Sequence, residues 1–364
     1  HFQTIWLSGE SDEIVQAIDQ RKLPFMFEIL DMATVTDVYN AIRDMAVRGA
    51  PLIGITGAYG IYLALLAYNG NKLNSYLDEV ASYLKSSRPT AVNLAFAIDE
   101  VVRTCRNSTI GDAVSKALKK TTGLKEKEVG YCSRIGDHGL ALIEGIYKEK
   151  KRAVNVLTHC NAGWLACIDW GTATAPVYKA SQKGIPVHVW VDETRPRNQG
   201  ARLTAFELAE EGVPHTIIPD NTGGHLMQHG EVDLVIVGSD RTSVSGDVAN
   251  KIGTYLKALA AHDNQIPFYV ALPSSSIDWG ITDGVSEIPI EQRDPSEVGF
   301  IEGWAKNQII SVRLTPEKSR TANYGFDVTP ARLVTGLITE KGICKADKKS
   351  ITTLYPEKKY LWQK

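Results

Sequence analysis

The pattern of hydrophobic and polar positions changes character near residue 146. Before it, a short strand-like start at residues 4–7 is followed by apolar residues at helical spacing over residues 37–47 and by a second predicted helix at residues 52–68. After it, short apolar runs alternate with helical segments. We therefore predict a smaller, mainly helical domain over residues 1–146 and a larger α/β domain over residues 147–364. The charged segment 144–152 is the expected connection between them.

The larger domain has the spacing of repeated strand–helix units. Strands are predicted at residues 153–157, 186–191, 215–218, 232–237 and 267–271, and helices at residues 178–183, 201–211, 224–229 and 250–261. Units of this length imply a doubly wound, parallel, Rossmann-like sheet. A last helix is predicted at residues 330–338. No GxGxxG motif follows any predicted strand, so a dinucleotide cofactor is not indicated.

Composition and charge argue against several classes of protein. The formal net charge is −2, and the 40 Lys and Arg residues are scattered along the chain, which argues against a nucleic-acid surface. The longest apolar stretch, residues 58–67, is shorter than the roughly 20 residues that a membrane helix needs. Residues 1–10 lack the apolar core of a signal peptide. Five cysteines without a CxxC motif favour a cytoplasmic protein over a disulfide scaffold.

The chain is expected to form a homodimer. Trp164, Trp170 and the apolar segment 58–67 offer more hydrophobic surface than two modest domains bury. Covering such surface with a second copy of the chain is a common solution in soluble proteins.

Two residues with reactive side chains follow predicted strands. Asp240 comes just past the strand at residues 232–237, and Cys160 closes the first strand of the larger domain. In open α/β sheets, ligands bind at the carboxyl ends of the strands, so both are candidates for catalysis. The alternatives at this point are a buried, inert cysteine and an aspartate that only caps a turn.

Positively charged residues lie beside three predicted helix starts. Arg48 with Gly49 and Ala50 precedes one helix, Arg88 precedes another, and Asn250 with Lys251 begins a third. Helix amides and guanidinium groups both favour phosphate, so these segments predict an anion site. A single loop of this kind is more often a plain connection between helices.

The loop at residues 192–202 is unusually polar and follows another strand. Its Gln199 and Arg202 are candidates for binding sugar hydroxyls or phosphate, and a solvated surface loop is the alternative. His225 and His229 have the HxxxH spacing without the adjacent glutamate of a zinc motif, so no metal site is predicted.

Several motifs along the chain together carry a resemblance to a known family. They are Val47-Arg48-Gly49-Ala50-Pro51, Ser87-Arg88-Pro89-Thr90, Cys160-Asn161-Ala162-Gly163, Glu193-Thr194-Arg195-Pro196, Gln199-Gly200, Gly238-Ser239-Asp240-Arg241, Asn250-Lys251-Ile252-Gly253-Thr254-Tyr255 and Arg293-Asp294-Pro295. In this order they resemble the aldose-1-phosphate isomerase family, whose fold is also similar to regulatory subunits of a translation-initiation exchange factor. Two departures are Asn323-Tyr324-Gly325-Phe326-Asp327, where the family usually shows Asn-Pro-Ala-Phe-Asp, and the loop at residues 221–225.

The resemblance implies a set of site residues. Cys160 and Asp240 would be the catalytic pair, and the substrate contacts would be Arg48, Gly49, Ala50, Arg88, Gln199, Asn250 and Lys251. It also implies a sugar phosphate as the partner, no cofactor, and a homodimer. A non-catalytic regulator is the alternative, and that class would be expected to lack Cys160 and Asp240.

The implied reaction is an aldose–ketose isomerisation in methionine salvage. A furanose 1-phosphate has no free aldehyde, so the enzyme must open the ring with Asp240 as the acid at the ring oxygen. Hydrogen then moves from C2 to C1, with Cys160 as a thiolate base or as a polar stabiliser of a hydride shift. The resemblance implies 5-methylthioribose 1-phosphate as the substrate. The loop at residues 220–229 carries no extra Lys or Arg for a second phosphate, which favours an uncharged 5-substituent. The alternatives are 5-deoxyribose 1-phosphate and ribose 1,5-bisphosphate.

Overall fold

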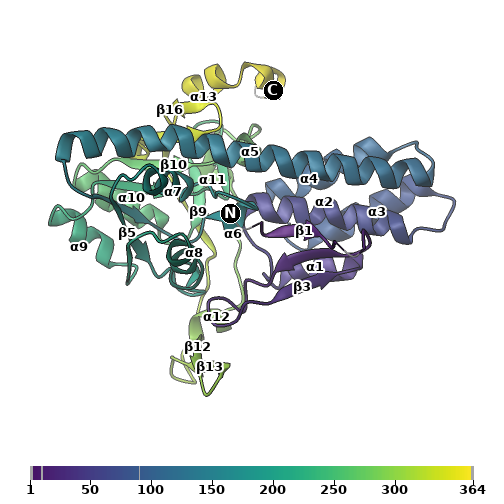
Figure 1. The fold of residues 1–364 in the computed structure, drawn as a ribbon, viewed down its shortest axis with the longest axis horizontal. Coiled ribbons are helices and arrows are strands. Elements are labelled where there is room, and N and C mark those ends of the chain that lie inside the picture. Colours follow the sequence, from purple (N-terminus) through teal and green to yellow (C-terminus); the bar gives the residue numbers. More distant parts are fainter. Residues whose placement is uncertain (1–2, 10, 90, 362–364) are drawn as a thin grey trace.

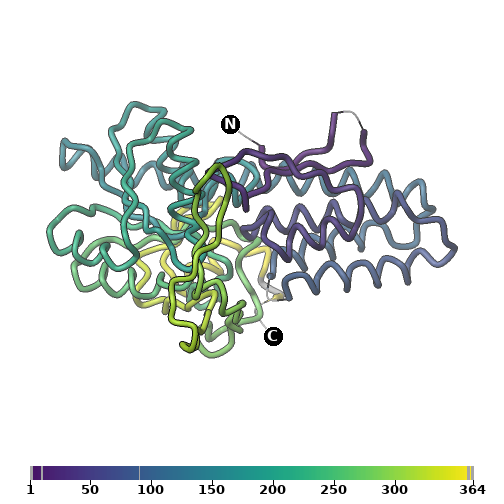
Figure 2. Tube along the Cα trace, turned by 90° about the horizontal axis from the view of Figure 1, so that it is seen from below, coloured from purple at the N-terminus to yellow at the C-terminus, as the bar shows by residue number. Residues whose placement is uncertain are grey.

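A computed structural model describes residues 3–9, 11–89 and 91–361, so Thr90 of one motif lies outside the described residues. The chain forms a mainly helical N-terminal part and an α/β C-terminal part that lie side by side (Figures 1 and 2). The predicted fold class is confirmed.

The N-terminal part contains a small sheet that the sequence pattern did not predict in full. Strands β1 (Ile5–Leu7), β2 (Val15–Ile18) and β3 (Ile29–Met32) pair antiparallel, and only β1 was expected. The helices that follow are α1 (Val35–Arg43), α2 (Ala50–Ala67), α3 (Leu73–Ser86) and α4 (Val92–Cys105).

Helix α2 is apolar on all sides, and such a helix must be surrounded by protein to be stable in water. Its residues from Ala50 to Leu65 are all buried. Among the described helices it is the one with the length and hydropathy of a membrane span, and 83% of it is buried in the protein. The segment that was expected to cover a dimer interface is therefore core. Trp164, the second part of that argument, is also buried, at 1% exposure.

Helix α5 (Ile110–Lys150) crosses the predicted boundary between residues 146 and 147 without a break. In Figure 1 it runs along the top of both parts. Its first half packs against the core of the N-terminal part through Ala113 and Ala117, and its second half packs under the large sheet through Ile135 and Ile143. The charged segment 144–152 is therefore mostly the last turns of a helix and not a connecting loop.

The large sheet has the order β16-β15-β10-β7-β4-β5-β6. Its strands are β4 (Val154–Thr158), β5 (Val187–Asp192), β6 (His215–Ile218), β7 (Leu234–Val237), β10 (Phe268–Ala271), β15 (Gly336–Thr339) and β16 (Gly342–Cys344). All neighbours are parallel except β16, which pairs antiparallel at the edge. Counted along the chain, the six parallel strands follow the order 3-2-1-4-5-6 of doubly wound folds, with the reversal between β4 and β7.

Helices cover both faces of this sheet, as the uninterrupted apolar strands require. They are α6 (Trp164–Cys167), α7 (Ala175–Gln182), the π-helical turn η1 (Gly200–Thr204), α8 (Ala205–Glu210), α9 (Thr222–Gln228), α10 (Thr254–Asp263) and α13 (Lys348–Leu354). Strand β7 shows the two faces: Leu234 and Ile236 join one core with α5 and α7, whereas Val235 and Val237 join the other with α9 and α10.

A second, small sheet corrects the predicted helix at residues 250–261. Its order is β11-β8-β9-β14, formed by β8 (Arg241–Ser243), β9 (Val248–Lys251), β11 (Ile277–Asp278) and β14 (Phe326–Thr329). Asn250 and Lys251 therefore end a strand, and α10 begins three residues later. The helix begins there because Gly253 adopts φ +102°, and its N–H donates to Asp327 Oδ2 at 2.7 Å.

The C-terminal region holds a second error of prediction. Residues 330–338 form a short 3₁₀ turn at Ala331–Leu333 and then β15, because Leu337 and Ile338 point to opposite cores of the sheet. Short helices α11 (Gly284–Glu287) and α12 (Ser296–Gly299) precede the hairpin of β12 (Phe300–Ala305) and β13 (Gln308–Arg313). The hairpin projects from the body of the molecule (Figure 1).

Candidate active site

Cys160 and Asp240 line one cavity at the point where the strand order reverses. Cys160 follows β4 and Asp240 follows β7, and these two strands are hydrogen-bonded neighbours. Several of the other residues expected from the sequence line the same cavity: Arg48, Gly49, Ala50 and Asn250. The carboxyl edge of the sheet is thus where the structure gathers the candidate chemistry, as the sequence pattern indicated.

Cys160 is held in an unusual backbone conformation. Its φ is +66°, which is rare for a residue with a side chain. Its N–H donates to Thr194 Oγ1 at 2.8 Å, and its carbonyl accepts a bond of 2.7 Å from Thr204 Oγ1. These bonds direct the thiol toward Gln199, whose Oε1 lies 3.6 Å from Sγ. Residues in such strained conformations cluster at functional sites.

Burial raises the pKa of the Cys160 thiol above its usual range. The positive charges of Arg48 and Lys251 act against this shift, and the charge of Asp240 adds to it. The thiol is therefore the neutral, proton-carrying form near pH 7, and not the thiolate.

Asp240 is half-buried and lines two cavities. Its N–H donates to the Ala249 carbonyl at 3.0 Å, which ties the end of β7 to β9. Besides the cavity of Cys160, it lines a neighbouring one with Arg88 and with apolar side chains that include Ile53 and Phe326. Asp240 therefore stands at the junction of the two spaces.

Arg48 and Lys251 are buried cations to which no described carboxylate is paired. Arg48 donates from Nη1 to Asn161 Oδ1 at 2.6 Å and from Nη2 to the Asn161 carbonyl at 2.8 Å. Lys251 lies over the ring of Phe326, 4.6 Å from its centre. Burial lowers the pKa of Lys251, while Cys160 and Asp240 raise it. Buried cations without a paired carboxylate are suited to bind an anion such as phosphate.

Arg88 adds a third cation from the N-terminal part. It is 9% exposed, and its Nη2 donates to Glu291 Oε2 at 3.1 Å. Its Nε is buried without a hydrogen-bond partner in the described part of the chain. A buried, unpaired guanidinium donor is costly unless a ligand accepts the bond. Arg88 and Arg48 both lower the pKa of Lys251, so the three charges act on a common space.

Gln199 lies beside the Cys160 thiol and lines a third cavity. That cavity is also lined by Arg48, Arg202 and Gln20. The Arg202 guanidinium is used within the protein, because it donates to the carbonyls of Leu23 and Arg21 and pairs with Glu302. The structure thus places Gln199 beside the thiol and gives Arg202 a structural role. Asn250 is buried at the site and donates to Thr254 Oγ1.

Gly49 is required by its backbone and by its neighbour. Its φ is +94°, and a Cβ there would stand 2.5 Å from the Cβ of Ala166. This contact brings the first turn of α2 against the segment that follows Cys160. Gly49 and Ala50 line the cavity, and backbone amides in the first turn of a helix have no partner within the helix.

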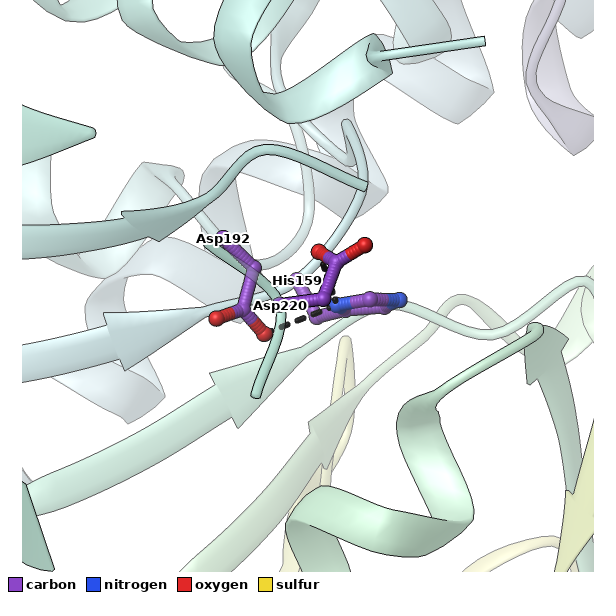
Figure 3. A group of neighbouring side chains, drawn as sticks. All are labelled: His159, Asp192 and Asp220. Carbon is purple, nitrogen blue, oxygen red and sulfur yellow. Dashed lines mark hydrogen bonds and ion pairs between the residues drawn. The ribbon is translucent and has the colours of Figure 1, made fainter. Parts of the chain in front are cut away.

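Behind Cys160, the described residues contain one group of three potential metal ligands: His159, Asp192 and Asp220 (Figure 3). His159 Nδ1 lies 2.8 Å from Asp192 Oδ2, and its Nε2 lies 2.8 Å from the Ile252 carbonyl. Lys257 Nζ also lies 3.1 Å from Asp192 Oδ2. Asp220 accepts bonds from two backbone amides. Because these atoms already have partners, we interpret the group as a network that joins β4, β5 and the end of β9.

Three residues that hold the site residues in place were not predicted as such from the sequence. Asn161 holds Arg48, Glu207 holds Asn161 at 2.8 Å, and His159 bonds the backbone next to Lys251. Each acts through a contact between segments far apart in the chain. Gln20, after β2, is a fourth: its Oε1 is buried without a partner among the described residues. Asn161 alone lies inside a motif that the sequence brings to attention.

Comparisons with known proteins agree with this geometry. Residues 46–346 match the model of the Initiation factor 2 subunit family. The methylthioribose-1-phosphate isomerase of Desulfatibacillum aliphaticivorans is 57% identical over 98% of both chains. The crystal structure of 5-methylthioribose 1-phosphate isomerase from Pyrococcus horikoshii is 34% identical, with a TM-score of 0.84 over 98% of this chain and 96% of that one. A structure described as translation initiation factor eIF-2B, subunit delta, from A. fulgidus is 35% identical, with a TM-score of 0.79 over 97% and 99%.

Proposed function

The chain belongs to the Initiation factor 2 subunit family and within it to the methylthioribose-1-phosphate isomerases, and from this we propose that it isomerises 5-methylthioribose 1-phosphate to 5-methylthioribulose 1-phosphate. The reaction is a step of methionine salvage. The observation that carries the proposal is the shared cavity of Cys160 and Asp240, which Arg48 also lines; Lys251 interacts electrostatically with all three residues and with Arg88.

The first step opens the ring. Asp240 gives its proton to the ring oxygen as the bond between C1 and that oxygen breaks, and the phosphate stays on C1. The C2 hydrogen then reaches C1, and the C2 hydroxyl becomes the ketone by giving its proton to the Asp240 carboxylate that the first step left, which restores the acid. The substrate supplies both the electrons and the hydrogen, so no external oxidant is consumed.

Cys160 has two possible parts in the second step. As a thiolate it would remove the C2 hydrogen as a proton, and as a neutral thiol it would stabilise the oxygen while hydride moves directly. The raised pKa of the buried thiol supports the second route. The hydrogen bond to Gln199 would keep the thiol directed at the sugar.

The phosphate is proposed to lie among Arg48, Arg88 and Lys251, next to the first turn of α2. Their charges act on one space, and Arg88 Nε has no partner there in the described residues. Gly49 and Ala50 would contribute backbone amides, and Asn250 and Gln199 would bind hydroxyls. These roles are proposals that rest on position and chemistry.

The preference for an uncharged 5-substituent does not rest on residues 220–229, as the sequence had suggested. Residues 220–229 line none of the three cavities, so their lack of charge does not bear on specificity. The third cavity does contain additional arginines. They are paired with carboxylates, Arg21 with Asp19 and Arg202 with Glu302, which leaves little positive charge for a second phosphate.

A substrate panel tests the proposal. Purified protein would be given methylthioribose 1-phosphate, 5-deoxyribose 1-phosphate and ribose 1,5-bisphosphate, with ketose formation followed by NMR. We expect the highest kcat/KM for the first. A preference for the bisphosphate would move the chain to the alternative isomerase, and no turnover of any of the three would favour a non-catalytic regulator.

Two further expectations belong to this proposal. A cytoplasmic location follows from five free cysteines, of which four are buried. A homodimer remains our proposal from the family resemblance, since most of the apolar surface first invoked for it, Trp164 and residues 58–65, is buried within one chain. Light scattering at micromolar concentration would test the dimer, and a monomer would contradict it.

A further inference from the structure

Glu207 is a buried carboxyl whose partners belong to the active-site loop. It lies on α8, is fully buried, and has no place in the reaction described above. Two backbone amides donate to it, Trp164 N to Oε2 at 2.8 Å and Leu165 N to Oε1 at 3.0 Å. Asn161 Nδ2 donates to Oε1 at 2.8 Å, and the Tyr178 hydroxyl donates to Oε2 at 2.9 Å. Four donors thus converge on one carboxyl group.

The same carboxyl group fixes Arg48 through one intermediate. Asn161 uses its amide nitrogen on Glu207, so its Oδ1 must face the other way, toward Arg48 Nη1 at 2.6 Å. The carbonyl of Asn161 accepts the second Arg48 bond at 2.8 Å. If Glu207 were absent, the Asn161 amide would keep only its longer bond to Thr204 Oγ1, and the side-chain anchor of the guanidinium would loosen.

The helical segment that carries Glu207 also holds Cys160. Thr204 lies three residues earlier, so the two side chains share a face of the helix. Thr204 Oγ1 donates to the Cys160 carbonyl at 2.7 Å and accepts from Asn161 Nδ2 at 3.2 Å. The turn that leads to Thr204 is π-helical, a feature that is frequent at functional sites.

The loop that follows Cys160 has a glycine where the Glu207 carboxyl group approaches the backbone. A Cβ at Gly163 would stand 1.7 Å from Glu207 Oε2, so no side chain fits there. Burial raises the pKa of Glu207 to about 7, and the bonds from Asn161, Leu165, Tyr178 and Trp164 act in the opposite direction. A group this costly to bury needs a compensating role.

We propose that Glu207 is a positioning residue, which through Asn161 holds the Arg48 guanidinium in place to bind the phosphate of the substrate. This inference rests on the proposed function for the identity of the substrate. Its test needs only inorganic phosphate, because the role concerns binding of the phosphate group. Arg48 anchored at two points loses less freedom when it binds, so affinity should depend on Glu207 more than turnover does.

The test compares four single variants and one double variant by thermal melting, by the KM and kcat for methylthioribose 1-phosphate, and by calorimetric titration with inorganic phosphate. Glu207→Leu should raise KM and the phosphate Kd by roughly tenfold or more, with a smaller fall in kcat. Glu207→Gln keeps an acceptor for Asn161, and Tyr178 can accept from its new amide, but the Trp164 N–H loses its acceptor. The melting temperature should therefore fall, while both constants stay within about threefold of wild type. If Glu207→Leu does not fold, Glu207→Asp, which is one methylene shorter, replaces it with the same expectation.

Tyr178→Phe is the matched control. It removes one bond to the same carboxyl group but leaves the path through Asn161 untouched, so it should lower the melting temperature without changing the phosphate Kd. Asn161→Ala should weaken phosphate binding as Glu207→Leu does, and the double variant should be no weaker than either single one. Unchanged phosphate affinity in Glu207→Leu, an equal loss of affinity in Tyr178→Phe, or additive losses in the double variant would overturn the proposal. Phosphate binding is measured without catalysis. An inactive wild-type protein would therefore refute the proposed function, while the phosphate Kd values of the variants would still decide this inference.

Discussion

The thiol of Cys160 lies 3.6 Å from the side-chain oxygen of Gln199, although 39 residues separate them in the chain. Cys160 leaves the end of β4, and Gln199 precedes the π-helical turn after β5. The bond points the thiol hydrogen at Gln199, while Cys160 itself lines the cavity that Asp240 reaches from β7. The adjacent order of these strands in the sheet is therefore what makes a joint site possible.

Asp240→Asn should nearly abolish turnover. Asparagine keeps the shape and can donate a hydrogen bond, but it cannot transfer a proton to the ring oxygen. We expect kcat to fall by about 10²–10⁴-fold at every pH, with a small change in phosphate affinity. Steady-state kinetics from pH 6 to 9 would check this, and a variant that recovers at any of these pH values would contradict the role of Asp240 as the acid.

Cys160→Ser and Cys160→Ala separate the two roles of the thiol. If the neutral thiol donates a hydrogen bond, serine should retain more kcat than alanine, because its hydroxyl can donate in the same direction. If a thiolate removes the C2 hydrogen, both variants should be equally impaired, since a serine hydroxyl is far too weak an acid to replace it. Deuterium at C2 that is retained at C1 of the product would support the hydride route, and its exchange with solvent would support the thiolate.

Arg88→Ala should act on substrate binding. Its side chain contributes a charge-assisted bond to phosphate, worth about 1.5–3 kcal/mol, so KM should rise by roughly 10–150-fold while kcat changes little. Arg103→Ala is a suitable control, because Arg103 is an exposed residue of α4 that pairs with Glu100. Equal losses of kcat in Arg88→Ala and Asp240→Asn, with KM unchanged, would remove Arg88 from the phosphate site.

Gly163→Ala should destabilise the protein and weaken phosphate binding together. The new methyl group would overlap Glu207 Oε2, so the loop or the Glu207 side chain would have to move. The expected loss is about 1–3 kcal/mol of unfolding free energy. Gly145→Ala on the exposed side of α5 meets no atom within 4 Å and should stabilise the helix by about 0.5–1 kcal/mol. Denaturant unfolding of both variants would show whether the two signs differ as expected.

The buried Glu128 on α5 should make stability depend on pH. Burial raises its pKa from 4.5 to about 7. Because the folded-state pKa is the higher one, the stabilisation is present below pH 4.5 and is lost as the pH rises through 7. Relative to Glu128→Gln, the wild-type protein should therefore lose roughly 3 kcal/mol of unfolding free energy between pH 4.5 and pH 8. If the unfolding free energy changed with pH in the same way for both proteins, Glu128 would have its ordinary pKa.

The sequence was sufficient for the parallel sheet because its strands are continuous apolar runs with regular spacing. It was insufficient where tertiary pairing decides the structure: residues 250–251 join a strand because β14 arrives from 75 residues away. The segment 330–338 has helical composition, yet its last residues form the strand β15, because they pair with the edge of β10. Local propensity is a weak guide when a long-range partner is available.

Prediction of the site followed the same division. Cys160, Asp240 and Arg48 stand in short motifs at strand and helix ends, where position alone suggests chemistry. Glu207 and His159 could not be recognised, because a buried carboxyl or imidazole gains its meaning from partners that the sequence does not show.

Helix α5 joins the half that supplies Arg48 and Arg88 to the half that supplies Cys160 and Asp240. Inserting or deleting one residue in an α-helix turns everything beyond it by about 100° and shifts it by about 1.5 Å. Such a change between Ala117 and Ile135 would rotate one set of packed side chains out of register with the other. We therefore expect natural length variation in this family to spare α5 and to accumulate in surface segments such as the β12–β13 hairpin.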